Sequence, residues 1–109
     1  MYISKYRCMW IVVLFDLPVD TENARRQYTR FRKGLLEDGF AMMQFSVYFR
    51  HCASSENLQV HIDRVESGVP PDGEVRIMQF TDKQFAMMKI FQGKRRTRAE
   101  SPPAQLEMF

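Results

Sequence analysis

The sequence predicts an α+β fold of the ferredoxin-like βαββαβ type, a four-stranded antiparallel sheet with two helices on one face. Three observations predict it: an apolar run at 10–15, helical spacing of apolar residues at 24–36 and 58–65, and alternating segments at 40–50 and 75–80. A chain of 109 residues, 45% of them hydrophobic, is long enough for one domain with its own core. This fold serves many functions, so function must be argued from particular residues.

The first predicted strand is the apolar run, which reads Trp-Ile-Val-Val-Leu-Phe and is followed by Asp16, Leu17 and Pro18. Such a run is typical of a strand buried on both faces, and it is too short to cross a membrane. Asp16 stands at the end of the strand, where the core meets solvent. A carboxylate there can bind a metal ion or cap the following turn, and the residue type alone leaves both open.

A helix should follow, because Asp20 or Thr21 can cap it and apolar residues then recur at helical spacing. Gly39 should end it. The next segment, 40–50, alternates one apolar face with a face of mixed aromatic and polar residues. It is long for one strand, so we expect a tight reversal near 44–46 and two short strands. The apolar face of the first helix consists of Ala24, Tyr28, Phe31 and Leu35.

The second helix should begin after Ser54 or Ser55, and a turn at 68–73 should lead to the last strand of the sheet at 75–80. The apolar face of this second helix consists of Leu58, Ile62 and Val65.

The C-terminal part adds a helical turn capped by Thr81 or Asp82, and a short strand at 89–92. We divide the chain into a ferredoxin-like domain, residues 1–92, and a basic, proline-containing tail, residues 93–109. The tail ends in Gln105–Phe109, whose apolar alternation is typical of a strand. Because the fold leaves a sheet edge open, this extra strand should add to the sheet of a partner, giving a two-fold homodimer with crossing tails.

Composition excludes several classes of protein. Cys8 and Cys52 have no metal-binding spacing, which argues against a zinc site and suits reduced thiols in the cytoplasm. Lys5 and Arg7 lead directly into the first strand, so we expect no signal peptide, and no segment should span a membrane. The net charge of +3 is a weak argument for nucleic acid, so the distribution of charge matters more.

Basic residues gather on the first predicted helix, where no acidic residue occurs between Glu22 and Glu37. Solvated helix faces usually mix both signs, so this cluster favours the phosphate backbone of a duplex, without base readout. We expect Arg76 and the run 94–98 to extend the same basic surface, although that run suits a solubilising tail equally well. The predicted nucleic-acid-binding residues are Arg25, Arg26, Arg30, Arg32, Lys33 and Arg76.

Several stretches, in this order and spacing, resemble the Cas-two family, the second CRISPR-associated protein, and its type II branch in particular. They are the aromatic-Asp-Leu-Pro motif at 15–18, the Arg-rich first helix, Gln-Phe-Ser-Val-Tyr at 44–48 and Thr-Asp-Lys-Gln-Phe at 81–85. The resemblance implies a homodimer that bridges two dimers of the Cas-one integrase while new spacers are captured from protospacer duplex DNA. It also implies an alternative, because some members are metal-dependent endonucleases on RNA or DNA.

The resemblance further implies that two copies of Asp16, one from each protomer, hold one Mg²⁺ near the two-fold axis. By sequence the only other acid near it is Asp20, so we expect a loose magnesium site and favour metal binding over catalysis. Ser46 matches a family position and either contacts phosphate or a metal-bound water, or satisfies nearby backbone. A third class of function, a small toxin-like ribonuclease that needs no metal, is weaker.

Overall fold

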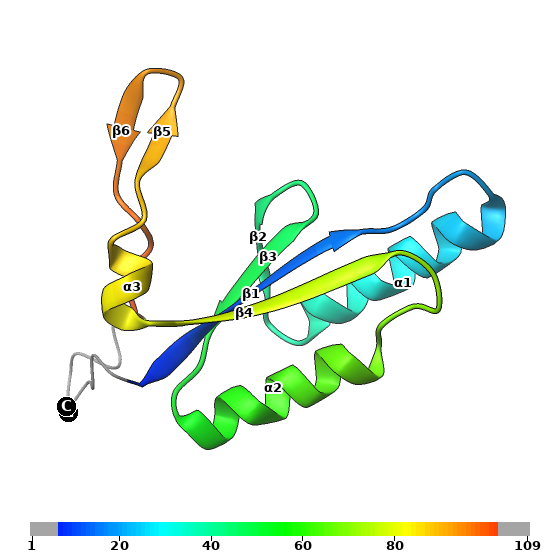
Figure 1. Cartoon of the computed structure of the whole chain (residues 1–109), viewed down its shortest axis with the longest axis horizontal. Coiled ribbons are helices and arrows are strands. Elements are labelled where there is room, and N and C mark those ends of the chain that lie inside the picture. Colours follow the sequence, from blue (N-terminus) through cyan, green and yellow to red (C-terminus); the bar gives the residue numbers. More distant parts are fainter. Residues whose placement is uncertain (1–6, 103–109) are drawn as a thin grey trace.

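A four-stranded antiparallel sheet with strand order β2-β3-β1-β4 forms the centre of the computed structural model, which describes residues 7–102 (Figure 1). Two long helices cover one face of this sheet, which confirms the predicted fold class. The elements are β1 (Cys8–Asp16), α1 (Glu22–Glu37), β2 (Ala41–Gln44), β3 (Val47–His51), α2 (Ser55–Ser67) and β4 (Glu74–Thr81).

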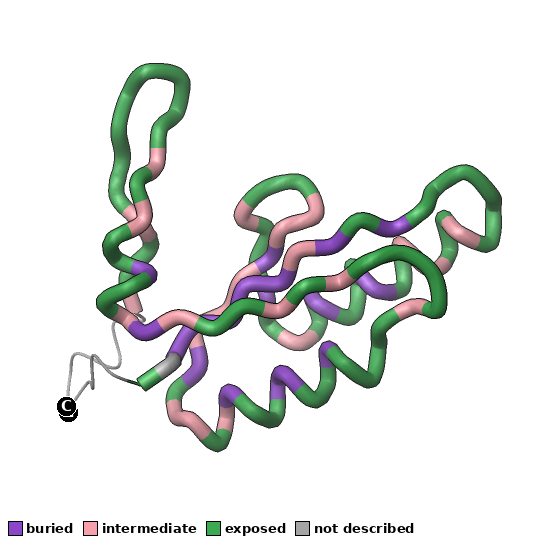
Figure 2. Tube along the Cα trace, viewed as in Figure 1, coloured by how far each residue is buried: buried purple, intermediate pink, exposed green. Residues whose placement is uncertain are grey.

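The main core lies between the sheet and the two helices (Figure 2). Ile11, Val13 and Phe15 point toward the helices from alternate positions of β1, as the two-residue period of a strand requires. There they join buried residues of α1 and α2, namely Phe31, Leu35, Leu58, Ile62 and Val65. The predicted helical faces are therefore confirmed.

In the β2–β3 hairpin the faces are the reverse of what hydrophobicity alone indicates. Tyr48 and Phe40, from the mixed face, are buried in the main core, whereas Ala41 and Phe45, from the apolar face, are exposed. Register explains this, because Tyr48 lies opposite Val13, whose side chain points toward the helices. The reversal itself lies where it was predicted, between Gln44 and Val47.

The predicted ends of both helices are confirmed. Thr21 caps α1, where its Oγ1 accepts a hydrogen bond from the Ala24 amide at 3.0 Å, and Ser54 caps α2 in the same way. Gly39 follows α1 with a φ of +88°, a left-handed conformation that suits glycine after a last helical turn.

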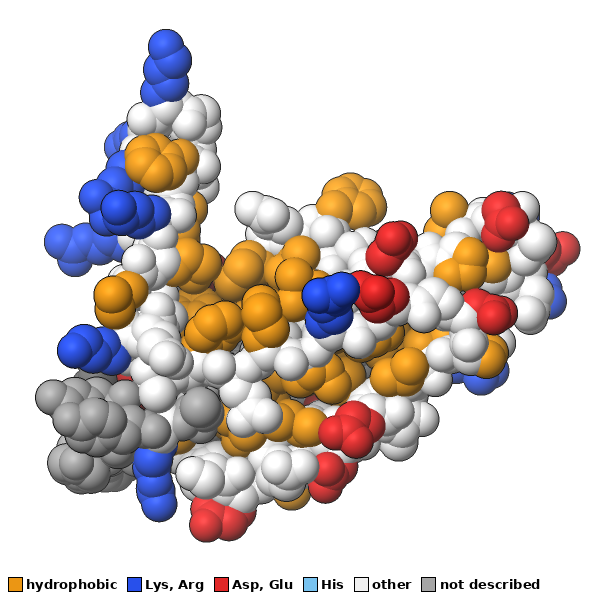
Figure 3. Space-filling view, in the orientation of Figure 1, with side chains coloured by type: hydrophobic (Ala, Val, Ile, Leu, Met, Phe, Trp, Pro, Cys, Tyr) orange, Lys and Arg blue, Asp and Glu red, His pale blue; other side chains and the backbone are white. Residues whose placement is uncertain are grey.

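The other face of the sheet is largely apolar, and among the described elements only the short helix α3 (Asp82–Ala86) packs on it, at one end. Trp10 and Val12 are buried there against Phe85 of this helix. Around them lie partly buried or exposed apolar side chains, which Figure 3 shows gathered over the sheet. This open sheet face consists of Leu14, Met43, Val47, Phe49, Met78, Phe80 and Met88.

Helix α3 is anchored by Trp10. The indole ring stacks on Phe85 with ring centroids 3.9 Å apart, and its Nε1 donates a hydrogen bond to Asp82 Oδ1 at 2.7 Å. His51 Nε2 lies 3.4 Å from the same oxygen. Burial lowers the pKa of His51, and Asp82 offsets that effect only in part, so the imidazole is neutral at pH 7.

Beyond α3 the chain forms a hairpin, the arm, which stands away from the sheet (Figure 1). It consists of β5 (Ile90–Gln92), which confirms the predicted short strand, and β6 (Arg95–Thr97), which lies within the predicted charge run. Its turn spans the predicted boundary between domain and tail. The predicted closing strand, Gln105–Phe109, lies outside the described residues. No helix among residues 7–102 combines the length and apolarity that crossing a membrane requires.

Candidate functional site

Three of the predicted site residues meet in an open concavity of about 320 Å³ at the end of β1. Asp16 comes from β1, Ser46 from the β2–β3 turn and Arg76 from β4. Neighbouring side chains provide an apolar floor, an exposed aromatic ring and a second carboxylate. The remaining lining residues are Leu14, Phe15, Phe45, Val47 and Glu74.

The position of Asp16 follows from the pairing of β1 with β4. Asp16 lies opposite Glu74 at the end of this antiparallel ladder, so both side chains leave the sheet on the same face. Gly73 permits the backbone before β4 to pass close to the backbone at the end of β1. A Cβ at Gly73 would lie 2.7 Å from the Asp16 carbonyl oxygen, and the φ of +91° at this position favours glycine. The Asp16 side chain is exposed.

Glu74 corrects the prediction that only Asp20 could provide a second acid near Asp16. The two carboxylates of this ladder are far apart in sequence, and only the register of β1 against β4 brings them together. Glu74 also accepts a hydrogen bond from Arg76 Nε at 2.7 Å. This hydrogen bond, and the charge of Arg76, hold the pKa of the Glu74 carboxyl below its ordinary value.

Ser46 is the turn residue that holds the hairpin against β1 and α1. Its φ is +61°, an uncommon left-handed conformation for a residue with a side chain. Its carbonyl oxygen accepts a hydrogen bond from the Phe15 amide at 3.0 Å, and its Oγ lies 3.5 Å from the Tyr28 hydroxyl. The Ser46 hydroxyl therefore meets a side chain of α1 instead of nearby backbone, and the backbone of Ser46 joins the hairpin to β1.

The donor set around Asp16 meets only part of what Mg²⁺ requires. Asp16 and Glu74 present oxygen ligands of the kind Mg²⁺ prefers, with the Ser46 hydroxyl in the same concavity. Within residues 7–102, however, no group of three or more His, Cys, Asp and Glu side chains is placed to hold a metal ion. The carboxylates that one chain brings to this concavity are therefore too few to hold Mg²⁺ by themselves.

The basic residues of α1 divide between two sides of the helix. Four of them share one exposed face around a shallow concavity, with Glu22 and Glu37 at its ends. Arg26 pairs with Glu22 at 3.2 Å, and Arg25 donates to the Val19 carbonyl at 3.1 Å. This α1 basic face consists of Arg25, Arg26, Arg30 and Lys33.

Arg32 and Arg76 do not belong to that surface. Arg32 turns toward the sheet, and its Nε donates a hydrogen bond to the Tyr48 hydroxyl at 2.8 Å. Arg76 lies opposite Leu14, on the face of the sheet away from the helices. The structure thus places Arg76 in the same concavity as Asp16, and Arg76 does not extend the α1 basic face.

A family model described as "CRISPR associated protein Cas2" matches residues 9–88 of this chain. The chain belongs to the Cas2 family. This is the family that the motifs at 15–18, 44–48 and 81–85 indicated. The matched region contains Asp16, the α1 basic face, Ser46 and Arg76, and it ends before the arm.

Curated relatives agree over nearly the whole chain. A protein of Parvibaculum lavamentivorans is 54% identical over 93% of this chain and all of its own length. One of Flavobacterium psychrophilum is 49% identical over 98% of this chain and 93% of the relative. Both are named "CRISPR-associated endoribonuclease Cas2".

A solved structure titled "Crystal structure of cas2" has the same fold. It aligns with a TM-score of 0.54 at 25% identity, covering 81% of this chain and 92% of that one. The Cas2 fold therefore presents two separate candidate surfaces here: the Asp16 concavity on the open side of the sheet and the α1 basic face on the helix side.

Proposed function

We propose that this Cas2 protein acts in CRISPR adaptation as a basic homodimer that holds protospacer duplex DNA between dimers of the Cas-one integrase. The observation that carries the proposal is the α1 basic face, four exposed cations with no acid between Glu22 and Glu37. Cations along one rigid helix bind the phosphate backbone of a duplex irrespective of its sequence. A protein that captures new spacers must accept DNA of any sequence, which this kind of binding allows.

The open sheet face supports the dimer in this proposal. Met78 is 40% exposed, and Phe49 and Phe80 are only partly buried, so one chain leaves much apolar surface in contact with water. A second copy would bury this face around a two-fold axis. The edge strand β4 and the arm would provide pairing strands at the rim.

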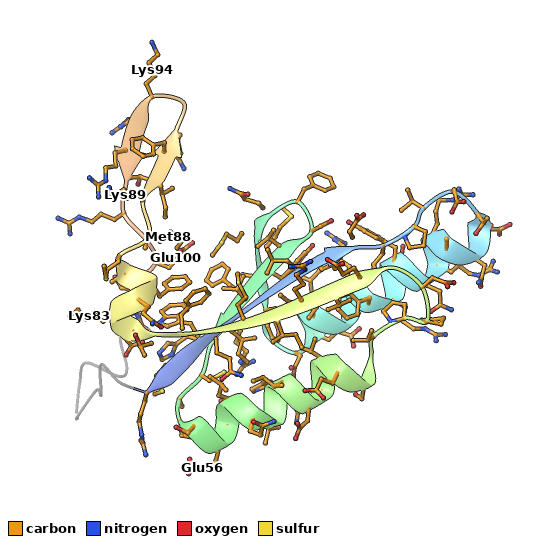
Figure 4. The ribbon with its side chains drawn as sticks, in the orientation of Figure 1. Glu56, Lys83, Met88, Lys89, Lys94 and Glu100 are labelled. Atoms are coloured by element: carbon orange, nitrogen blue, oxygen red, sulfur yellow. The ribbon has the colours of Figure 1, made fainter. Side chains whose placement is uncertain are left out.

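The arm supplies further cations for the same DNA. Figure 4 shows Lys89 and Lys94 projecting from it, and Figure 3 shows basic side chains along its length. Three arginines follow Lys94 with no acid among them, Arg95, Arg96 and Arg98. Because the dimer would have a fixed width, cations on both protomers would set the length of duplex between the two integrase dimers. This assembly would work in the cytoplasm.

The test is charge reversal on the α1 basic face. The double variant Arg30→Glu/Lys33→Glu should weaken binding of every duplex sequence about equally. It should also reduce the slope of log K against log salt by about 0.9 for each phosphate that the helix no longer neutralises. Fluorescence anisotropy with two unrelated duplexes at several salt concentrations measures both effects.

Lys83→Glu is the matched control, because it reverses one exposed cation on α3 at a distance from α1. It should leave the affinity within about twofold, as expected for a surface charge that does not touch the duplex. A loss confined to one duplex sequence, or an equal loss in the control, would contradict backbone binding by α1.

A second candidate function is a Mg²⁺-dependent endonuclease acting on RNA or DNA. Two observations favour it: Glu74 faces the strand-end Asp16, and the curated relatives are named endoribonucleases. In a dimer, Asp16 and Glu74 of both protomers would hold the ion, with Ser46 nearby. Bound Mg²⁺ would supply charge stabilisation and an activated water for phosphodiester hydrolysis. Arg76 would neutralise the phosphate.

Asp16→Ala separates the two functions. If the protein is a scaffold, spacer integration with the co-purified integrase should persist, because the α1 basic face is untouched. Any Mg²⁺-dependent cleavage should disappear. Loss of integration in a variant that still dimerises and binds duplex would refute the scaffold. RNA cleavage that survives EDTA but not Asp16→Ala would instead indicate a metal-independent ribonuclease.

A further inference from the structure

Gly34 stands in the last turn of α1, where the fold gives no reason for a glycine. After proline, glycine is the least favourable residue in a helix, and the φ at Gly34 lies outside the left-handed region. Space does not forbid a side chain either. A Cβ at this position would meet nothing within 4 Å beyond its chain neighbours and the turn of its own helix. The chain therefore loses helix stability at Gly34 without a gain in packing.

Two concavities meet at Gly34. One is the shallow concavity of the α1 basic face, of about 620 Å³, and the other is a groove of about 200 Å³ between α1 and α2. Gly34 and Arg30 line both of them. Because no side chain rises from the helix at Gly34, the backbone there forms a low saddle that joins the two concavities.

Arg64 of α2 provides a cation on the far side of this saddle. Its side chain lines the groove, is 61% exposed, and donates a hydrogen bond from Nη1 to Asp38 Oδ1 at 2.7 Å. This contact holds the guanidinium in place and leaves its other N–H groups for a ligand. The Asp38 carboxylate also contacts His61 at 2.7 Å, so its charge is already paired within the protein.

The order of charges directs an anionic chain across the saddle instead of farther along the helix. Arg30 and Lys33 precede Gly34, whereas Glu37 lies beyond it at the end of the α1 basic face. Phosphates that follow α1 from Arg30 therefore approach a carboxylate once they pass Gly34, which is unfavourable. The groove on the other side of the saddle offers them the Arg64 guanidinium instead.

The same lining residues define the form of nucleic acid that fits. The described residues around the two concavities include one aromatic, Phe31, which is only 5% exposed and belongs to the main core. Single strands are usually held by bases that stack on exposed aromatic rings, and these concavities offer none. A duplex covers its own bases and presents phosphates outward, so its backbone is the matching partner.

We propose that the backbone of a duplex crosses α1 at Gly34 and is held on α2 by Arg64, a further phosphate contact of this protein. The inference rests on the proposed function, in which the α1 basic face binds duplex DNA, and it adds the course of the strand over the protein. Glycine at position 34 lets the phosphates come close to the helix backbone, because a Cβ would stand in their way.

The first experiment compares the wild type with Gly34→Ala and Gly34→Leu as full-length proteins. Both variants should raise the midpoint of urea denaturation, because alanine and leucine are better helix formers than glycine. Both should nevertheless weaken duplex binding at least about fivefold, and leucine more than alanine, because added carbon atoms at a close contact displace the ligand. Urea denaturation and fluorescence anisotropy measure the two effects.

The second experiment removes the cation beyond the saddle. Arg64→Gln should weaken binding of every duplex sequence about tenfold, the loss of one hydrogen bond to a charged group. It should also reduce the slope of log K against log salt by about 0.9. Combined with Gly34→Leu, it should cost less than the product of the two separate losses, because both changes disrupt the same crossing.

Lys83→Gln is the matched control for Arg64→Gln, because it neutralises an exposed cation on α3, away from both concavities. It should change duplex affinity by less than about twofold. The proposal is overturned if Arg64→Gln behaves like this control, or if both Gly34 variants leave duplex affinity intact. Weaker retention of the integrase by the Gly34 variants, with unchanged duplex affinity, would also overturn it, because Gly34 would then contact a protein.

Failure of this inference differs from failure of the proposed function. If Arg30→Glu/Lys33→Glu weakens duplex binding but the changes at Gly34 and Arg64 do not, the duplex stays on α1 and the crossing is wrong. If the double variant has no effect while Gly34→Leu and Arg64→Gln weaken duplex binding, the crossing stands and the α1 basic face does not carry the duplex.

Discussion

Trp10→Ala should lower the free energy of unfolding by about 3–5 kcal/mol, the usual cost of removing a fully buried tryptophan. Trp10 is only 1% exposed, and its ring joins β1 to α3 through Phe85 and Asp82. The variant leaves a cavity between the sheet and α3, and it leaves the partly buried Asp82 carboxylate without its donor. Urea denaturation followed by far-UV circular dichroism measures the loss.

Trp10→Phe is the informative companion variant. It keeps an aromatic ring against Phe85 but cannot donate to Asp82, so it should cost roughly 1–3 kcal/mol, the penalty for an unsatisfied buried acceptor. Hydrogen exchange of residues 82–86 should accelerate in both variants, because these residues depend on Trp10 for their docking. A loss of less than about 1 kcal/mol in Trp10→Ala would show that α3 is not held in this way.

Asp38→Ala should cost about 2–3 kcal/mol, because the Asp38 carboxylate joins the end of α1 to α2. Its Oδ2 lies 2.7 Å from His61 Nδ1, and its Oδ1 accepts a hydrogen bond from Arg64 at 2.7 Å. The Asp38 side chain is largely buried, and the His61 side chain is 6% exposed. Removing the carboxylate would leave a buried imidazole without its partner. Chemical denaturation at pH 7 measures the effect.

The same ion pair predicts a pH dependence. Burial acts to raise the pKa of the Asp38 carboxyl, but hydrogen bonds from His61 and Arg64 and their charges outweigh it, so the pKa lies below its ordinary value of 3.8. The stabilisation is therefore complete above about pH 4 and disappears as the pH falls through the lowered pKa. The wild type should lose this contribution on acidification, and Asp38→Ala should not.

Asp63→Ala is the matched control for this prediction. Asp63 lies on α2 and accepts a hydrogen bond from Gln59 at 2.8 Å, but it is exposed. Its removal should change the stability by less than about 0.5 kcal/mol, the usual range for a surface substitution. An equal loss of stability in both variants would mean that the buried contacts of Asp38 do not stabilise the fold more than a surface hydrogen bond does.

The elements of the fold could be predicted because each is specified by residues close together in the chain. The apolar run at 10–15, the helical spacing of Phe31 and Leu35, and the Thr21 and Ser54 caps are local signals, and the structure agrees with all of them. The reversal at 44–46 could be predicted for the same reason. The assignment of faces in that hairpin could not, because it depends on which side of β3 meets Val13.

The strand that ends in Asp16, the acid-free stretch of α1 and the family to which the chain belongs could all be established from residue order alone. Tertiary structure decided which groups surround Asp16 and which cations share a surface. It placed Glu74 opposite Asp16 and Phe45 beside it, turned Arg32 toward Tyr48, and put Arg76 on the other face from α1. The physical reason is register: the pairing of β1 with β4 and β3 joins residues distant in sequence, and no local period specifies which residues will be opposite.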